Sequence, residues 1–105
     1  MATQKLTTKY YESHVTIDPV IDAYKRQLTE LAEAFKFKVA DLLMSKEGHL
    51  VASDHDMFMT GHSHDYELLN RNMIALVLAL AEQGYKVRRY KMEAVIFDSR
   101  VRSIL

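Results

Sequence analysis

Residues 10–17 read YYESHVTI, and the side chains along this stretch alternate between two sets. The odd-numbered positions hold Tyr11, Ser13, Val15 and Ile17, and the even-numbered positions hold Tyr10, Glu12, His14 and Thr16. A period of two is typical of a strand with one buried face and one polar face. The alternation therefore predicts a strand whose even-numbered side chains face solvent. Residues 1–9 are polar and rich in threonine, and we expect them to form a flexible N-terminal arm.

Two helices are predicted from apolar residues that recur at helical spacing. The first covers residues 19–35, where Asp18 is the expected N-cap and Pro19 occupies the first helical position. The second covers residues 68–80 and ends at Gly84, because glycine favours the position just after a helix.

Three further strands complete the predicted secondary structure. Residues 37–44 and 57–60 are short apolar stretches, and residues 85–97 (YKVRRYKMEAVIF) form the longest strand. The polar residues 45–56 are expected to form a loop or a hairpin arm, and residues 98–105 a C-terminal tail.

The order strand, helix, strand, strand, helix, strand predicts an α+β fold. In its ferredoxin-like βαββαβ form, a four-stranded antiparallel sheet has the spatial order 4-1-3-2 and carries both helices on one face. The 105 residues fit a single domain of this kind. The first and last strands are then neighbours, so their polar sides share the face without helices. That face is expected to hold His14, Thr16, Arg89, Lys91 and Glu93.

Composition excludes several classes of protein. Lys plus Arg and Asp plus Glu both number 14, and a neutral domain without a broad basic stripe argues against duplex nucleic acid as a partner. The absence of Cys excludes disulfides and Cys-ligated metals. No apolar run approaches the roughly 20 residues of a membrane span, and no signal-peptide core opens the chain. We therefore expect a cytoplasmic domain without membrane contact.

The stretch His14-Val15-Thr16-Ile17 places an imidazole and a hydroxyl two residues apart, so that both can contact one small group. It resembles the His-x-Thr-hydrophobic strand motif of the 2H phosphoesterases. In that family two such motifs flank a phosphoester, the histidines act as general acid and base, and the Ser or Thr hydroxyls hold the phosphate. The resemblance implies catalytic roles for His14 and Thr16 on one half of such a fold. A second motif is absent, so the sources of the second acid–base group are His62 or His64, Lys91 or Glu93, and the His14 of a second copy.

Residues 60–65 (TGHSHD) precede the second helix as a predicted turn and helix cap. Backbone N–H groups and the helix dipole at such a turn favour an anion, which makes His62, Ser63 and His64 candidate ligand-binding residues. The alternative is an ordinary capped turn without a ligand. The spacing of the histidines, His55 included, matches no metal-ligand pattern, so we expect no metal and no other cofactor.

The sequence thus predicts a small homo-oligomeric protein with a phosphate- or nucleotide-ligand site on the open sheet face. Hydrolysis is left open, and an enzyme of this kind would be a phosphoesterase similar to the 2H family. The alternative is a non-enzymatic module that packs the same face against a second copy and binds no small molecule. A sheet that binds single-stranded RNA needs aromatic residues on two strands. Only Tyr10 meets that requirement, because Tyr11 and Tyr90 fall on the helix-covered side.

Overall fold

The structure, a computed structural model, describes residues 7–40 and 56–97. These residues form strands and helices in the order β1 (Thr7–Ile17), the 3-10 helix η1 (Asp22–Tyr24), α1 (Lys25–Ala34), β2 (Lys38–Ala40), β3 (Met57–Ser63), α4 (Tyr66–Glu82) and β4 (Val87–Phe97). The predicted α+β class is confirmed, as is a four-stranded antiparallel sheet with two α-helices.

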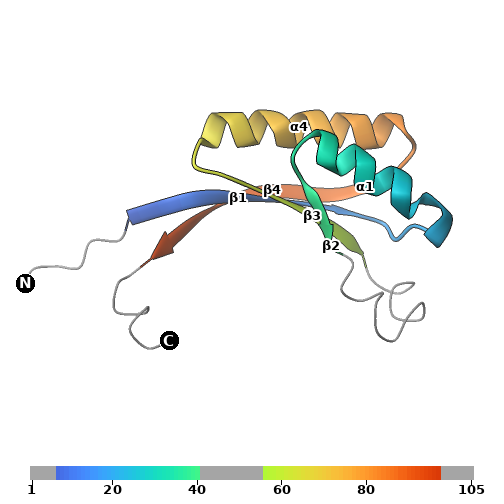
Figure 1. The fold of residues 1–105 in the computed structure, drawn as a ribbon, viewed down its shortest axis with the longest axis horizontal. Coiled ribbons are helices and arrows are strands. Elements are labelled where there is room, and N and C mark those ends of the chain that lie inside the picture. Colours follow the sequence, from blue (N-terminus) through green and yellow to red (C-terminus); the bar gives the residue numbers. More distant parts are fainter. Residues whose placement is uncertain (1–6, 41–55, 98–105) are drawn as a thin grey trace, which may run out of the picture.

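The strands form one sheet with the order β2-β3-β1-β4, and each neighbouring pair is antiparallel. Read from the opposite edge, this order is 4-1-3-2. β1 therefore lies between β3 and β4, and the first and last strands of the chain are adjacent. Figure 1 shows α1 and α4 on the same side of the sheet. No described element covers the other side, which we call the open face.

The core lies between the helices and the sheet. Side chains of α4 are buried at a spacing of three and four residues, which forms one apolar stripe along the helix. Alternate residues of β1 and β3 meet this stripe from the sheet side. The buried apolar residues are Val15, Ile17, Leu28, Ala32, Phe37, Met57, Met59, Leu69, Met73, Leu76 and Leu80. Because the core uses one side of each strand, the other side is left for the open face.

β1 begins earlier than the sequence predicts. Thr7 and Thr8 pair with the end of β4, so the predicted arm is wrong for residues 7–9. This pairing does not require apolar residues, because the backbone of β4 supplies the hydrogen-bond partners. The rest of the predicted arm, the loop, the end of the second predicted strand and the tail lie largely or wholly outside the described residues.

The first helix begins later than predicted, because Asp18 has other partners. Its backbone N–H donates to the carbonyl oxygen of Lys86 at 3.0 Å, and its Oδ1 lies 2.8 Å from Nη1 of Arg88. Helical structure starts with η1 at Asp22, and Tyr24, the N-cap of α1, makes no side-chain capping bond. The carboxylate of Asp18, which was expected to cap the helix, therefore links the end of β1 to β4.

β3 continues through Ser63, so the predicted strand 57–60 is too short and the predicted turn is wrong for residues 61–63. Gly61 lies on the core side of this strand, against the ring of Phe37. A Cβ added at Gly61 would lie 2.9 Å from Cε1 of that ring. Glycine is therefore needed here for close packing of a buried ring and not for a turn.

The ends of α4 follow the predicted chemistry. The Asp65 carboxylate accepts a hydrogen bond from the backbone N–H of Leu68 at 3.1 Å, so the predicted helix cap is made by Asp65 and not by Ser63, which the sequence also allows. At the other end Gly84 has a φ of 94°, a conformation that favours glycine, so the predicted helix stop is confirmed.

Candidate functional site

Three consecutive rungs of side chains cross the open face, each centred on a residue of β1. From β3 through β1 to β4 they are His62, Glu12 and Glu93; Thr60, His14 and Lys91; and Phe58, Thr16 and Arg89. Residues two apart on a strand point to the same side, so the rungs form one continuous patch. The residues predicted to share this face all belong to it: His14, Thr16, Arg89, Lys91 and Glu93.

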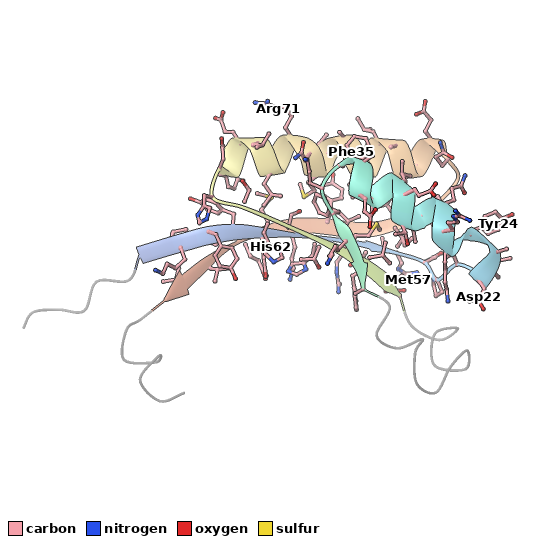
Figure 2. The ribbon with its side chains drawn as sticks, in the orientation of Figure 1. Asp22, Tyr24, Phe35, Met57, His62 and Arg71 are labelled. Carbon is pink, nitrogen blue, oxygen red and sulfur yellow. The ribbon has the colours of Figure 1, made fainter. Side chains whose placement is uncertain are left out.

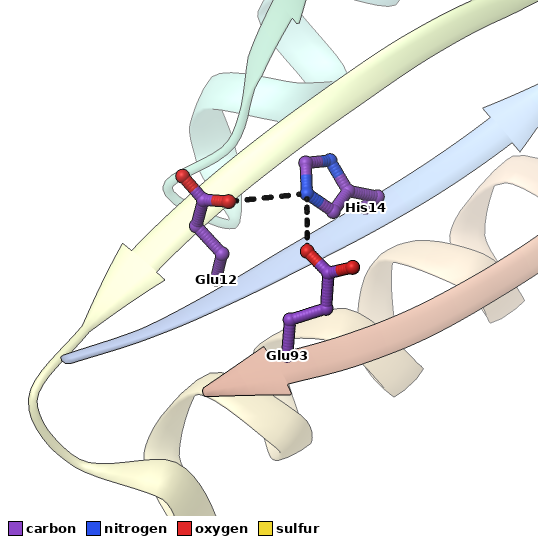
Figure 3. A group of neighbouring side chains, drawn as sticks. All are labelled: Glu12, His14 and Glu93. Atoms are coloured by element: carbon purple, nitrogen blue, oxygen red, sulfur yellow. Dashed lines mark hydrogen bonds and ion pairs between the residues drawn. The ribbon is translucent and has the colours of Figure 1, made fainter. Parts of the chain in front are cut away.

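Carboxylates and imidazoles meet at one end of the patch. We call Glu12, His14, His62 and Glu93 the carboxylate–imidazole cluster. Nε2 of His14 lies 3.2 Å from Oε1 of Glu12 and 3.3 Å from Oε1 of Glu93, as Figure 3 shows. Nε2 of His62 lies 3.1 Å from Oε2 of Glu12, and Figure 2 shows His62 on the side of the sheet away from the helices. One imidazole therefore sits between two carboxylates, and a second imidazole holds the outer oxygen of one of them.

His14 also has a neighbour at its other ring nitrogen. Oγ1 of Thr60 lies 3.4 Å from Nδ1 of His14. A hydroxyl can donate or accept, so Thr60 is compatible with either neutral tautomer of the ring. The His14 side chain is 29% exposed, so part of the side chain is reachable from the open face. The ring can therefore hold a proton or a cation between the two carboxylates.

A hollow of about 320 Å³ opens on the open face beside this cluster. It is lined by His14, Thr16, Phe58, Thr60, Arg89 and Lys91. Thr16 is only 4% exposed, although the sequence pattern predicts a solvent-facing position; its cross-strand partners are Phe58 and Arg89. The lining combines cations, hydroxyls, an imidazole and an aromatic ring, a set that favours an anionic ligand rich in acceptor oxygens.

The two cations of the hollow have different surroundings. Nζ of Lys91 lies 3.2 Å from Oε2 of Glu93. The hydrogen bond and the charge of Lys91, with a smaller effect of His14, lower the pKa of Glu93 below its ordinary value of 4.5. Within residues 7–40 and 56–97, no carboxylate lies within ion-pair distance of Arg89. Arg89 thus presents a less compensated positive charge than Lys91.

The predicted anion turn does not form a single site. His62 joins the open face, whereas Oγ of Ser63 accepts a hydrogen bond from the backbone N–H of Asp65 at 2.9 Å. Nδ1 of His64 donates to the carbonyl oxygen of Lys9 at 3.0 Å, away from the hollow. His55 lies outside the described residues.

Three members of the patch are not among the predicted site residues: Glu12, Phe58 and Thr60. The sequence could have identified Glu12, because it is two residues before His14 on the polar side of the same strand. Phe58 and Thr60 alternate with buried methionines, and this parity places them on the open face. Phe58 is 42% exposed, so the statement that only Tyr10 is aromatic on that face is wrong. Tyr90 is also exposed, because it lies on the edge strand β4.

A larger cavity, of about 540 Å³, lies between the start of α1 and the start of β4. Its lining is mostly apolar or neutral, and includes Ile21, Tyr24 and Tyr85. Its carboxylate, Asp18, is paired with Arg88. The convergence of imidazole, hydroxyl and cationic groups at the hollow makes the open face the stronger candidate site.

Neither a family model nor a curated protein matches the chain. None of the helices in the described ranges is long and apolar enough to cross a membrane. The resemblance of residues 14–17 to the 2H motif stays a prediction.

Proposed function

We propose that this chain is a ferredoxin-like domain that binds a small phosphate-bearing ligand, of the nucleotide class, in the hollow on its open sheet face. One observation carries the proposal: Arg89 and Lys91 line that hollow together with hydroxyl and imidazole groups. Guanidinium and ammonium groups make strong, charge-assisted hydrogen bonds to phosphate oxygens. The lining is therefore complementary to phosphate in both charge and hydrogen-bond donors.

Arg89 is expected to contribute most to affinity. Its planar guanidinium can donate two parallel hydrogen bonds to phosphate, and no carboxylate among the described residues pairs with it. Lys91 shares its charge with Glu93, so it contributes less. A hydrogen bond to a charged group is worth about 1.5–3 kcal/mol, which corresponds to roughly 10- to 150-fold in affinity.

Phe58 favours a nucleotide over free phosphate. It belongs to the same rung as Arg89, with Thr16 between them, and its ring is exposed. An exposed ring can stack on a base, which contributes about 1–3 kcal/mol, while the guanidinium binds the phosphate. A volume of about 320 Å³ is at the small end of ligand pockets, which suits one nucleotide better than a longer strand.

The 2H resemblance supports the same ligand class. His14 and Thr16 both line the hollow, where that motif implies an acid–base group and a phosphate-holding hydroxyl. His62 supplies a second imidazole on this face, linked to His14 through Glu12. Hydrolysis would require one imidazole to be protonated and the other neutral. We therefore propose ligand binding as the function. Whether the chain also hydrolyses phosphodiesters is tested by a turnover assay with a panel of phosphodiester substrates.

Self-association through the open face is the competing function, because a second copy would cover the same hollow. Size-exclusion chromatography with light scattering, on the free and the ligand-saturated chain, separates the two. A ligand in the hollow would dissociate a dimer formed through this face, and it would leave a monomer unchanged.

The proposal is tested by isothermal titration of the full chain with inorganic phosphate and with adenosine 5′-monophosphate. Arg89→Gln should weaken nucleotide binding by roughly 10- to 150-fold, and Lys91→Gln should weaken it less. Arg71→Gln is the matched control, because Figure 2 shows Arg71 on the outer side of α4; it should bind as the wild type does. No heat with either ligand, or equal losses in Arg89→Gln and Arg71→Gln, would exclude the hollow as a phosphate site.

A further inference from the structure

The carboxylates of the carboxylate–imidazole cluster have no part in phosphate binding, and their closeness to each other favours a cation between them. Glu12 and Glu93 are direct cross-strand partners on β1 and β4. Like charges in that position destabilise a sheet. Both carboxylates nevertheless turn their Oε1 atoms toward one point, Nε2 of His14, at 3.2 and 3.3 Å. This convergence of two oxygens and a ring nitrogen is the arrangement of a metal-ligand set (Figure 3).

The separations also fit metal coordination. In a tetrahedral zinc site with bonds of about 2.0–2.1 Å, neighbouring ligand atoms lie roughly 3.3 Å apart. The two oxygen–nitrogen distances at His14, 3.2 and 3.3 Å, match that value, and the ligand oxygens of Glu12 and Glu93 lie no more than 4.8 Å apart. Carboxylate and imidazole ligands together suit Zn²⁺ and related first-row ions.

Each of these three side chains has an outer partner that orients it. His62 holds the second oxygen of Glu12 at 3.1 Å, and Lys91 holds the second oxygen of Glu93 at 3.2 Å. Oγ1 of Thr60 lies 3.4 Å from Nδ1 of His14, where it can accept a hydrogen bond from Nδ1–H once Nε2 binds a metal. Ligands oriented in this way by outer partners are characteristic of metal centres.

We propose that Glu12, His14 and Glu93 bind a divalent transition-metal ion of the Zn²⁺ type, with His62, Thr60 and Lys91 as positioning residues. Three protein ligands leave one position of a tetrahedral ion open, as in catalytic zinc sites. Because His14 also lines the hollow, that open position faces the same surface as the phosphate site. The metal site does not depend on the phosphate proposal, since its ligands include the carboxylates that phosphate would avoid.

Spacing along the chain does not reveal this site. Glu12 and His14 are two residues apart on β1, but Glu93 comes from β4 at the other end of the chain, so no short motif contains all three. Of the described histidines that lie close together in the sequence, His62 contacts Glu12, whereas His64 donates to the backbone of Lys9. The geometry thus points to a metal site that the spacing of the histidines does not predict.

The test is titration of the full chain with Zn²⁺, by calorimetry, and with Co²⁺, by visible absorption, in buffer free of phosphate and chelators. One ion per chain is expected, with the absorption bands of tetrahedral Co²⁺. His14→Ala and Glu93→Gln should abolish detectable binding. Thr60→Val should weaken it by about 10- to 100-fold, because it removes only an outer partner.

Two controls make the result decisive. His64→Ala removes an exposed imidazole, and Glu67→Gln an exposed carboxylate, outside the cluster; both should bind the metal like the wild type. The proposal is overturned if the wild type binds no metal, or if His64→Ala loses binding while Glu93→Gln keeps it. Glu93 is exposed, so its variant keeps the test valid even where His14→Ala does not fold, which circular dichroism reports. Phosphate and nucleotide are absent, so failure here is distinct from failure of the proposed function.

Discussion

Replacing Gly61 with alanine tests whether this glycine serves the core or a turn. The added methyl would lie 2.9 Å from Cε1 and 3.0 Å from Cζ of Phe37. The ring is 1% exposed, so it has no open space to enter. Gly61 is not among the described residues with positive φ, so alanine meets no backbone strain there.

The expected cost follows from two opposing effects. Overpacking a core costs about 1–3 kcal/mol, and alanine regains about 0.5–1 kcal/mol in a strand because glycine is more flexible when unfolded. Gly61→Ala should therefore lower the free energy of unfolding by about 1–2 kcal/mol. Each kcal/mol should lower the Tm by roughly 4–8 °C in a domain of this size.

A double-mutant cycle identifies Phe37 as the cause. Leucine at position 37 lacks Cε1 and Cζ, so Phe37→Leu removes the closest contacts. In urea unfolding followed by circular dichroism, the double variant should be more stable than the sum of the single effects predicts, by about 1 kcal/mol. Gly84→Ala is the matched control. It adds a methyl where no atom lies within 4 Å but φ is +94°, so its cost should simply add to that of Phe37→Leu. Additive effects of Gly61→Ala and Phe37→Leu would refute the packing argument.

Two further predictions concern local interactions. Asp65→Ala should lower the free energy of unfolding by about 1 kcal/mol, because it removes the acceptor for the N–H of Leu68; Asp65→Asn, measured by the same urea titration, should restore most of it. Burial, and to a lesser extent the neighbouring Tyr24, raises the pKa of Tyr85 above its ordinary value of 10.0. A group with a raised pKa stabilises the fold below its unfolded pKa and loses that effect as pH rises through its folded pKa. The urea midpoint of the wild type, compared with that of Tyr85→Phe, should therefore decline as pH rises above about 10, and a pH-independent difference would contradict this assignment.

Local sequence patterns were sufficient for most of the secondary structure. The alternation of residues 10–17 depends only on the two-residue period of a strand, and the apolar stripe of α4 depends only on helical spacing. The ends of elements depend on competition between partners, and there the predictions fail. Asp18 is a good helix cap by residue type, but Arg88 of β4 takes its carboxylate.

The residues of the candidate site were likewise predicted only in part. The alternation of side chains along β1 and β4 correctly predicts that His14, Arg89 and Lys91 share one face. On β3, Phe58 and Thr60 were not predicted as site residues, and His62 was predicted in a turn, because residues 61–63 look like a turn until Phe37 explains the glycine.

By itself, the sequence determined which stretches become strands and helices and which side of each strand is polar, since these follow from the spacing of side chains along the chain. Only the tertiary structure decided which oxygens and nitrogens meet, because strand register joins residues that are dozens of positions apart. Glu93 meets Glu12 and His14 only through that register. Coordination and ligand binding depend on ångström distances between such residues, which no spacing along the chain specifies.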